Sequence, residues 1–142
     1  MSPPTELAYR IGLAARRPAS WLQLFKFGLV GGSGYLINLA VFVVLSDTLG
    51  LHHIAAAIGA FCVAVANNFL WNRYWTFGPG TAHPAFQAMR FLMVSVAALV
   101  LNLIVLEALL RGTEMGSLTA QAIAVAVAMP FNFLGNKLWT FA

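Results

Sequence analysis

The chain has 142 residues, of which 61% are hydrophobic and only 8% are charged. An average soluble domain carries roughly 25% charged residues and keeps a large share of its surface in water, so this composition excludes a soluble domain. The net charge of +4 comes from Lys and Arg at the ends of apolar runs rather than from a basic stripe, which argues against a nucleic-acid partner. The composition indicates an integral protein whose surroundings are membrane lipid.

The first 23 residues are interpreted as a short cytoplasmic or interfacial arm, and residues 24–142 as the transmembrane domain. Within the arm, the apolar stretch 7–15 is interrupted by Arg10 and ends in Arg16 and Arg17. A secretory signal peptide needs a longer apolar core before its cleavage site. The arm is therefore expected to stay at the cytoplasmic surface.

A helix crosses a bilayer with about 20 mostly apolar residues. Four segments meet this requirement: 27–45, 54–71, 91–110 and 118–134. The first and third connections are short. The second, residues 72–88, is longer and contains Gly78-Pro79-Gly80 and His83-Pro84, which are signals that break helices. The sequence predicts an all-α membrane protein of two helical hairpins joined by a linker.

Cationic residues indicate the orientation of the spans, because Lys and Arg accumulate on the cytoplasmic side. They are concentrated in the N-terminal arm, the middle linker and the C-terminal end, whereas the two hairpin loops contain only Arg111. All four tryptophans fall on the same side as the cations, at the depth of an aromatic belt. We expect a multi-pass protein of the cytoplasmic membrane with both termini in the cytoplasm.

The second half of the chain repeats the first at a constant offset of 64 residues, in units of about 26–77 and 90–141. Polar, aromatic and cationic residues coincide in this register: Asn38 with Asn102, Asn68 with Asn132, Asn72 with Asn136, Lys26 with Arg90, Arg73 with Lys137, and Trp75 with Trp139. Each unit contains two spans, so the repeats are predicted to be parallel, related by an axis along the membrane normal. The register departs from symmetry at Ala66/Pro130 and Trp71/Gly135.

The second helix of each unit carries small and polar residues at a spacing of four, which places them on one helix face. These are Ala56, Ala60, Ala64, Asn68 and Asn72 in the first unit, and Ala120, Ala124, Ala128, Asn132 and Asn136 in the second. The alanines are expected to pack against a neighbouring helix. A buried amide without a partner costs on the order of 1–3 kcal/mol, so the asparagines need either hydrogen bonds between helices or a polar ligand. Both alternatives stay open.

Each ridge of alanines and asparagines ends in a string that we call NRYWTF (residues 72–77) or NKLWTF (residues 136–141). An amide beside a cation at headgroup depth suits a phosphate, because the cation offsets charge and the amide donates a hydrogen bond. The alternative is a cationic anchor with an aromatic belt. The presence of the full string twice favours a functional site at Asn72, Arg73, Asn136 and Lys137, with Asn68 and Asn132 behind them.

Two further positions carry polar groups inside the spans. Asn38 and Asn102 each lie 12 residues after the flanking cation, roughly 18 Å along the helix, where polar residues usually face the interior of a bundle. A structural hydrogen bond and a role in transport are both open. Glu107 and Arg111, four residues apart, are expected to pair, with a proton or substrate site at Glu107 as the alternative.

Arrangements that carry catalysis or bind metals are missing from the sequence. His52 and His53 are adjacent, which is poor spacing for one metal ion, and Cys62 is the single cysteine. There is no serine–histidine, dicarboxylate or Cys-x-x-Cys arrangement. We expect neither an enzyme nor a bound metal or cofactor.

The doubled pattern resembles the GtrA-like family of small four-span membrane proteins over about residues 24–141. The resemblance is carried by the segment 27–31 (FGLVG), the NRYWTF string, Arg90-Phe91 and the NKLWTF string. It implies a role in cell-surface polysaccharide synthesis. Members of this family are thought to move monosaccharides linked to polyprenyl phosphate across the cytoplasmic membrane, or to assist the glycosyltransferase that makes them.

The leading hypothesis is therefore a flippase for a polyprenyl-phosphate sugar, with Asn38, Asn102, Trp75 and Trp139 along the path of the headgroup. The alternative is a membrane subunit that recruits or stabilises a glycosyltransferase without transporting. A small multidrug exporter is less favoured, because such a carrier needs a carboxylate deep in the membrane and Glu107 is off-centre. Four spans make a slim bundle, so a homo-oligomer remains an open alternative.

Overall fold

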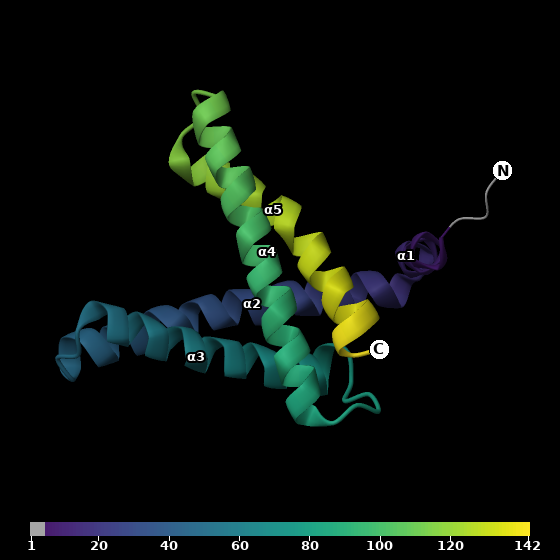
Figure 1. Ribbon diagram of the computed structural model, residues 1–142, viewed down its shortest axis with the longest axis horizontal. Helices are drawn as coiled ribbons and strands as arrows, with labels where there is room; N and C mark the ends of the chain where they lie inside the picture. The colour runs from purple at the N-terminus through teal and green to yellow at the C-terminus, as the bar shows by residue number, and fades with distance from the viewer. Residues whose placement is uncertain (1–4) are drawn as a thin grey trace. The chain divides into compact units, whose positions relative to one another are not determined.

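The apolar stretches of the sequence all form helices in the computed structural model, which describes residues 5–142 and contains no β-strand in that range. The α-helices are α1 (Glu6–Arg16), α2 (Pro18–Val43), α3 (His53–Trp71), α4 (Pro84–Gly112) and α5 (Ser117–Gly135) (Figure 1). Three π-helical turns continue them: η1 (Val44–Thr48), η2 (Asn72–Thr76) and η3 (Asn136–Thr140). Four of these helices, with their π-turns, are long and apolar enough to cross a membrane, which confirms the four predicted spans.

The spans begin earlier than their apolar runs. α2 begins at Pro18 and α4 at Pro84, because proline has no N–H to leave unsatisfied at the first position of a helix. The His83 ring caps α4 by accepting a 3.2 Å hydrogen bond from the Ala85 N–H, and His52 caps α3 from Ile54 N–H at 3.4 Å. The prediction that His83-Pro84 breaks helices within a connection of residues 72–88 was wrong, since these residues cap and start α4. The connection shrinks to residues 77–83.

The chain divides after Gly78 into two compact units, each built around one antiparallel pair of long helices. The first hairpin consists of α2 and α3 with their π-turns (Pro18–Thr76), and the second of α4 and α5 with η3 (Pro84–Thr140). Figure 1 shows the two helices of each hairpin running side by side. Each hairpin has an open end, where its first helix begins and its second helix finishes in a π-turn.

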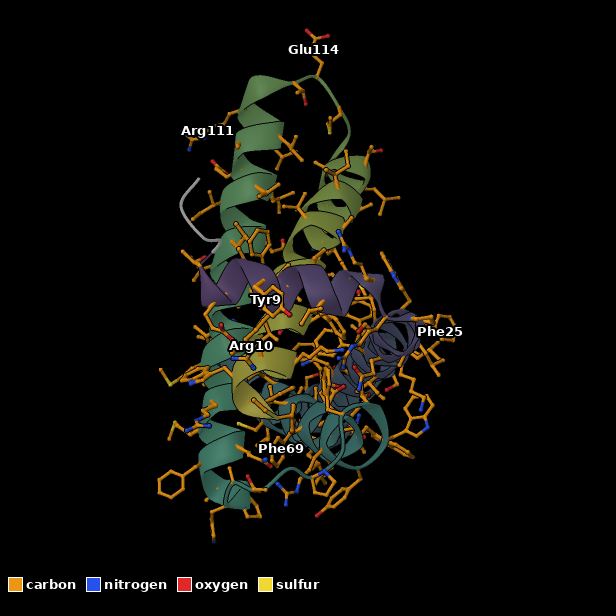
Figure 2. All side chains as sticks on the ribbon, turned by 90° about the vertical axis from the view of Figure 1, so that its right-hand side faces the viewer. Tyr9, Arg10, Phe25, Phe69, Arg111 and Glu114 are labelled. Atoms are coloured by element: carbon orange, nitrogen blue, oxygen red, sulfur yellow. The ribbon has the colours of Figure 1, made fainter. Side chains whose placement is uncertain are left out.

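α1 occupies part of the predicted N-terminal arm, of which residues 1–4 lie outside the described residues. Thr5 Oγ1 caps it by accepting from Ala8 N–H, and Ala14 is its buried residue. Tyr9 and Arg10 are exposed on its surface (Figure 2). The indole N–H of Trp21 donates a 3.0 Å hydrogen bond to the Ala15 carbonyl, which ties the end of α1 to the start of α2.

Candidate functional site

The alanine ridges form the seam of each hairpin. Ala56 and Ala60 of α3, and Ala120 and Ala124 of α5, have no exposed surface, and the third alanine of each ridge is also buried. Small side chains let two helix backbones approach closely. The van der Waals packing that results helps to hold helices together in lipid. The expectation that the alanines pack is confirmed. The seam leads to the asparagines at the open end of each hairpin.

The strings that follow the ridges are helical rather than part of a linker. The Phe77 N–H donates to the Asn72 carbonyl at 2.9 Å, and the Phe141 N–H donates to Asn136 in the same way at 2.9 Å. These bonds span five residues, so each string forms a wide π-turn, a feature that often marks functional sites in α-helices. The placement of residue 72 at the start of a linker was therefore wrong, because a helix pattern does not reveal a change to π geometry.

A cation from the start of the first helix holds each string. Lys26 Nζ donates to the Trp75 carbonyl at 3.4 Å and lies 5.1 Å from the centre of the indole ring. Arg90 donates to the Trp139 carbonyl at 3.3 Å and lies 5.5 Å from that ring. In both hairpins the cation and the tryptophan are 49 residues apart in the sequence. The sequence analysis treated Lys26 and Arg90 as charges that flank the spans. Both cations and both tryptophans, Trp75 and Trp139, recur at the same offset of 64 residues, and this repeat was the signal that could have predicted their contact.

Phenylalanine pairs lie beside these cation contacts. The rings of Phe27 and Phe77 are 6.0 Å apart, and those of Phe91 and Phe141 are 6.3 Å apart, both tilted. Aromatic rings at such separations attract each other edge to face. Each string is therefore anchored to the first helix of its own hairpin by one cation and one aromatic ring.

The cations within the strings lie against aromatic faces. Arg73 is buried, and its guanidinium carbon is 5.5 Å from the Tyr74 ring centre. Lys137 is half-buried, with its ammonium group 5.6 Å from the ring centre of Phe133. An aromatic face stabilises a cation that is partly removed from water. These contacts keep positive charge at the open end of each hairpin.

The predicted amides divide into two arrangements. In the second hairpin, Asn136 Nδ2 donates to both the backbone and the side-chain oxygen of Asn132, each at 2.9 Å. In the first hairpin, the Asn68 carboxamide instead occupies the space beside Gly34, where a Cβ would lie 2.1 Å from Asn68 Oδ1. Residue 98, the counterpart of Gly34, is alanine. Asn68 and Asn132, which are equivalent in the sequence repeat, thus make different contacts in the two hairpins.

A second asymmetry has a packing reason. A Cβ at Gly135 would lie 2.8 Å from Val94 Cγ1, so glycine allows α5 to approach α4 closely there. Its counterpart Trp71 points outward and is about half exposed. The sequence difference at Trp71/Gly135 therefore reflects a closer contact in the second hairpin.

Threonines of the strings are functional candidates that sequence reasoning missed. Thr76 and Thr140 are buried, and so are Asn72 and Asn136, which lie four residues earlier. The buried side-chain oxygens of all four residues have no hydrogen-bond partner among the described residues. The signal for the threonines was present in the sequence, because both strings contain Trp-Thr-Phe in the same register.

The mid-span asparagines are not brought to this site. Asn38 and Asn102 are half-buried within α2 and α4. They lie 12 residues along the helix from Lys26 and Arg90, respectively. Any role for them concerns the interior of the membrane rather than the open ends.

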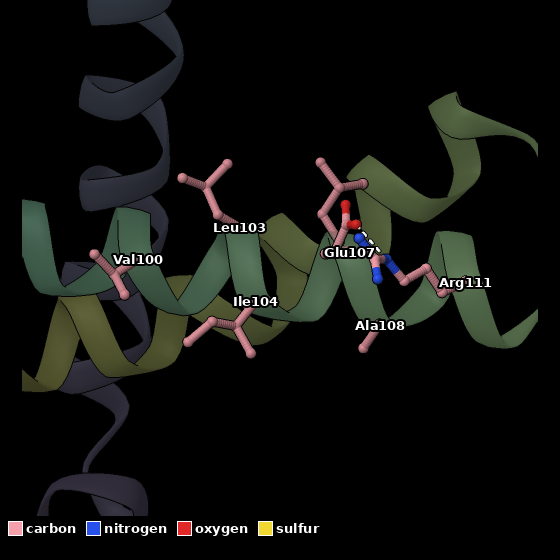
Figure 3. Close-up of a pocket in the computed structure, with 7 residues that line it drawn as sticks. Val100, Leu103, Ile104, Glu107, Ala108 and Arg111 are labelled. Carbon is pink, nitrogen blue, oxygen red and sulfur yellow. Dashed lines mark hydrogen bonds and ion pairs between the residues drawn. The ribbon is translucent and has the colours of Figure 1, made fainter.

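Glu107 pairs with Arg111, as the sequence predicts (Figure 3). The Arg111 and Glu107 side chains are 81% and 57% exposed. The concavity beside them is lined by α4 alone, through Val100, Leu103, Ile104, Leu106, Glu107, Ala108 and Arg111. A hollow on the outer surface of one helix does not enclose a ligand, so these residues do not build a second site.

Comparison with known proteins agrees with the doubled strings. Residues 26–141 match the family model described as "GtrA/DPMS, transmembrane domain". The chain belongs to this family. It is 30% identical over 118 residues to the uncharacterized membrane protein YngA of Bacillus subtilis strain 168, covering 83% of this chain and 78% of that protein.

A second relative is longer. The chain is 30% identical over 121 residues to the dolichol-phosphate mannosyltransferase of Pyrococcus furiosus. The match covers 84% of this chain but only 34% of that relative, so the chain spans about a third of its length. The matched segment of this longer relative thus corresponds to a GtrA/DPMS transmembrane domain in this chain.

Proposed function

We propose that this GtrA/DPMS-family protein translocates a monosaccharide linked to polyprenyl phosphate across the cytoplasmic membrane. The observation that carries the proposal is the doubled open end, where buried amides and cations lie together on a π-turn. A phosphate at headgroup depth would be attracted by such charge, and cationic side chains form its strongest hydrogen bonds. The polyprenyl tail would stay in the bilayer beside the apolar outer faces of the helices.

The orientation of the chain belongs to this proposal. The cations of the N-terminal arm, the middle connection and the C-terminal end favour a cytoplasmic location for all three. Each unit contains two spans, which supports two parallel repeats whose strings share the cytoplasmic face. The phosphate of a lipid donor made in the cytoplasm would then lie level with both strings.

Residues along the spans have roles in the same proposal. Arg73 and Lys137 would hold the phosphate, and Asn72 and Asn136, with Asn68 and Asn132 behind them, would line the site beside it. Trp75 and Trp139 would line the entrance for the headgroup. The half-buried Asn38 and Asn102 would offer it polar contacts further into the membrane, where an unpaired polar group is costly.

Purified protein in lipid vesicles provides the test. A fluorescent or radiolabelled short-chain polyprenyl-phosphate glucose is followed as it moves between leaflets, with and without the protein. Faster movement in the presence of the protein is expected, and a large loss when Arg73 and Lys137 are both changed to Ala. The matched control is Arg10→Ala, an exposed cation of α1 outside the strings. Normal movement in the double variant would overturn the site assignment.

A second candidate is a membrane subunit that recruits or stabilises a glycosyltransferase. It is favoured by the relative from Pyrococcus furiosus, because the matched segment makes up only 34% of a protein named as a mannosyltransferase. A separate chain of this family would then supply in trans what the segment supplies within that protein. Vesicles that contain this protein and show no translocation, together with a transferase that loses activity without it, would favour the subunit over the flippase.

A further inference from the structure

Each hairpin end contains a buried asparagine and threonine with unused hydrogen-bonding oxygens. Asn72 and Asn136 are 2% and 0% exposed, and Thr76 and Thr140 are 5% and 0% exposed. Their Oδ1 and Oγ1 atoms have no partner within residues 5–142. A buried polar atom left without a hydrogen-bond partner costs about 1–3 kcal/mol, so its presence in a folded protein needs an explanation, such as a ligand that it binds. The same two atoms, one asparagine Oδ1 and one threonine Oγ1, recur at the same places in both π-turns, which indicates one shared function.

The second hairpin fixes the direction in which its amide points. Asn136 Nδ2 contacts the backbone carbonyl of Asn132, which only accepts hydrogen bonds. The amide nitrogen must therefore face that carbonyl, and Oδ1 must face away from it. The remaining atom of Asn136 is an acceptor. An acceptor oxygen is complementary to a hydrogen-bond donor, whereas the oxygens of an ionised phosphate are acceptors themselves.

The threonine beside it complements this acceptor. Thr140 Oγ1 lies one turn further along the π-turn and can both donate and accept. An amide acceptor next to a hydroxyl is the pairing that suits a sugar hydroxyl, which also donates and accepts. Positive charge for an anion lies elsewhere at the same end, on Arg90 and Lys137 of this hairpin.

We propose that Asn72 with Thr76, and Asn136 with Thr140, form paired subsites for the hydroxyl groups of a neutral, sugar-like headgroup. The inference rests on the proposed function and deepens it, by separating a hydroxyl subsite from the cations that would hold the phosphate. The pairs are covered in this structure, so a ligand reaches them when the string moves away from the first helix. That movement separates each string from its cation, breaking the 3.4 Å hydrogen bond at Trp75 or the 3.3 Å hydrogen bond at Trp139.

Valine in place of threonine tests the subsites, because it keeps the shape and removes the hydroxyl. If Oγ1 has no structural partner, Thr76→Val and Thr140→Val leave the midpoint of thermal unfolding unchanged or raised. The matched control is Thr113→Val. Thr113 Oγ1 donates to the Leu109 carbonyl at 2.7 Å, so this variant is expected to unfold at a lower temperature.

Two probes separate the hydroxyl subsite from the anion site. Dodecyl β-glucoside and dodecyl phosphate are titrated into the full-length protein in phosphatidylcholine nanodiscs, with tryptophan fluorescence as the signal. Changing both threonines to valine is expected to weaken glucoside binding about fivefold or more, the equivalent of one hydrogen bond lost, and to leave phosphate binding unchanged. Wild-type protein that binds no glucoside would overturn the inference.

Other outcomes also decide the question. Unchanged glucoside binding in the double valine variant, or a lower unfolding temperature for it, would overturn the subsites, since the hydroxyls would then have another use. Failure of the translocation assay is a separate result. Glucoside binding that depends on Thr76 and Thr140 would support the subsites even in a protein that moves no lipid. Phosphate binding without glucoside binding would remove the subsites and leave the flippase proposal standing.

Discussion

The carboxamide of Asn68 fills the space that Gly34 leaves on the facing helix, because a Cβ at residue 34 would lie 2.1 Å from Asn68 Oδ1. This placement turns Asn68 towards α2. The corresponding Asn132 accepts from Asn136 along its own helix at 2.9 Å instead. One missing methyl group thus decides whether the two amides of a ridge interact with each other.

This difference predicts unequal coupling between the amides of the two hairpins. A double-mutant cycle with Asn132→Ala and Asn136→Ala should give a coupling free energy of about 1 kcal/mol, the usual net value of a hydrogen bond. The same cycle with Asn68→Ala and Asn72→Ala should give a value near zero. The measurement is the free energy of unfolding in detergent micelles. Equal coupling in both cycles would contradict the proposed asymmetry.

The substitution Gly34→Ala should make the first hairpin resemble the second. The three atoms nearest to the new Cβ all belong to the Asn68 carboxamide, at the end of a side chain that can rotate away. We expect a loss of about 1 kcal/mol in unfolding free energy, at the lower end of the range for overpacking. The coupling between Asn68 and Asn72 should then rise towards about 1 kcal/mol.

Ala98→Gly is the matched control for that substitution, since residue 98 is the counterpart of Gly34. It should cost about 0.5–1 kcal/mol, through the greater flexibility of glycine in a helix. It should also weaken the coupling between Asn132 and Asn136, because their amides gain an alternative position. A loss above about 3 kcal/mol in Gly34→Ala would show that the backbones, rather than one side chain, meet at this point.

Hydropathy was sufficient to predict the four spans, because a segment of about 20 apolar residues has few alternatives to a membrane helix. The helix ends were not predictable in the same way. Pro84 is a helix breaker in the interior and a helix starter at the first position, and only the cap formed by His83 decides between them. The alanine seam was predictable, since a spacing of four places small residues on one face.

The details of the open ends depend on contacts between helices. The π-turn at residues 72–76 changes the hydrogen bonding by one residue, which no side-chain pattern specifies. The Gly34–Asn68 contact depends on the register of α2 against α3, and sequence symmetry concealed it by pairing Asn68 with Asn132. Lys26 and Trp75 were each noted in the sequence, but their contact becomes apparent only when the hairpin closes.

The contact between Lys26 and Trp75 should contribute measurably to holding the first string. A cation over an indole ring contributes about 0.5–1 kcal/mol at exposed sites and about 2 kcal/mol when removed from water. A double-mutant cycle with Lys26→Ala and Trp75→Ala should therefore give a coupling of about 0.5–2 kcal/mol in unfolding free energy.

A cycle that pairs Lys26→Ala with Trp21→Ala controls for the general effect of removing a tryptophan. The Trp21 indole donates to the Ala15 carbonyl rather than contacting Lys26. Its coupling with Lys26 should be within about 0.3–0.5 kcal/mol of zero. Zero coupling between Lys26 and Trp75 would show that the cation does not hold the string.

Glu107 should be dispensable for both stability and transport. Its ion pair with Arg111 is on the surface of α4, and exposed pairs contribute about 0–1 kcal/mol. Glu107→Gln should therefore change the unfolding free energy by less than about 1 kcal/mol.

A proton-coupled exporter would instead need this carboxylate, so the variant should also be assayed for uptake of a lipophilic cation into vesicles under a proton gradient. Proton-driven uptake by the wild type that disappears in Glu107→Gln would favour the exporter over the flippase. The absence of such uptake in both proteins is the result expected here, because a carboxylate exposed beside an arginine is poorly placed to carry protons through the bundle.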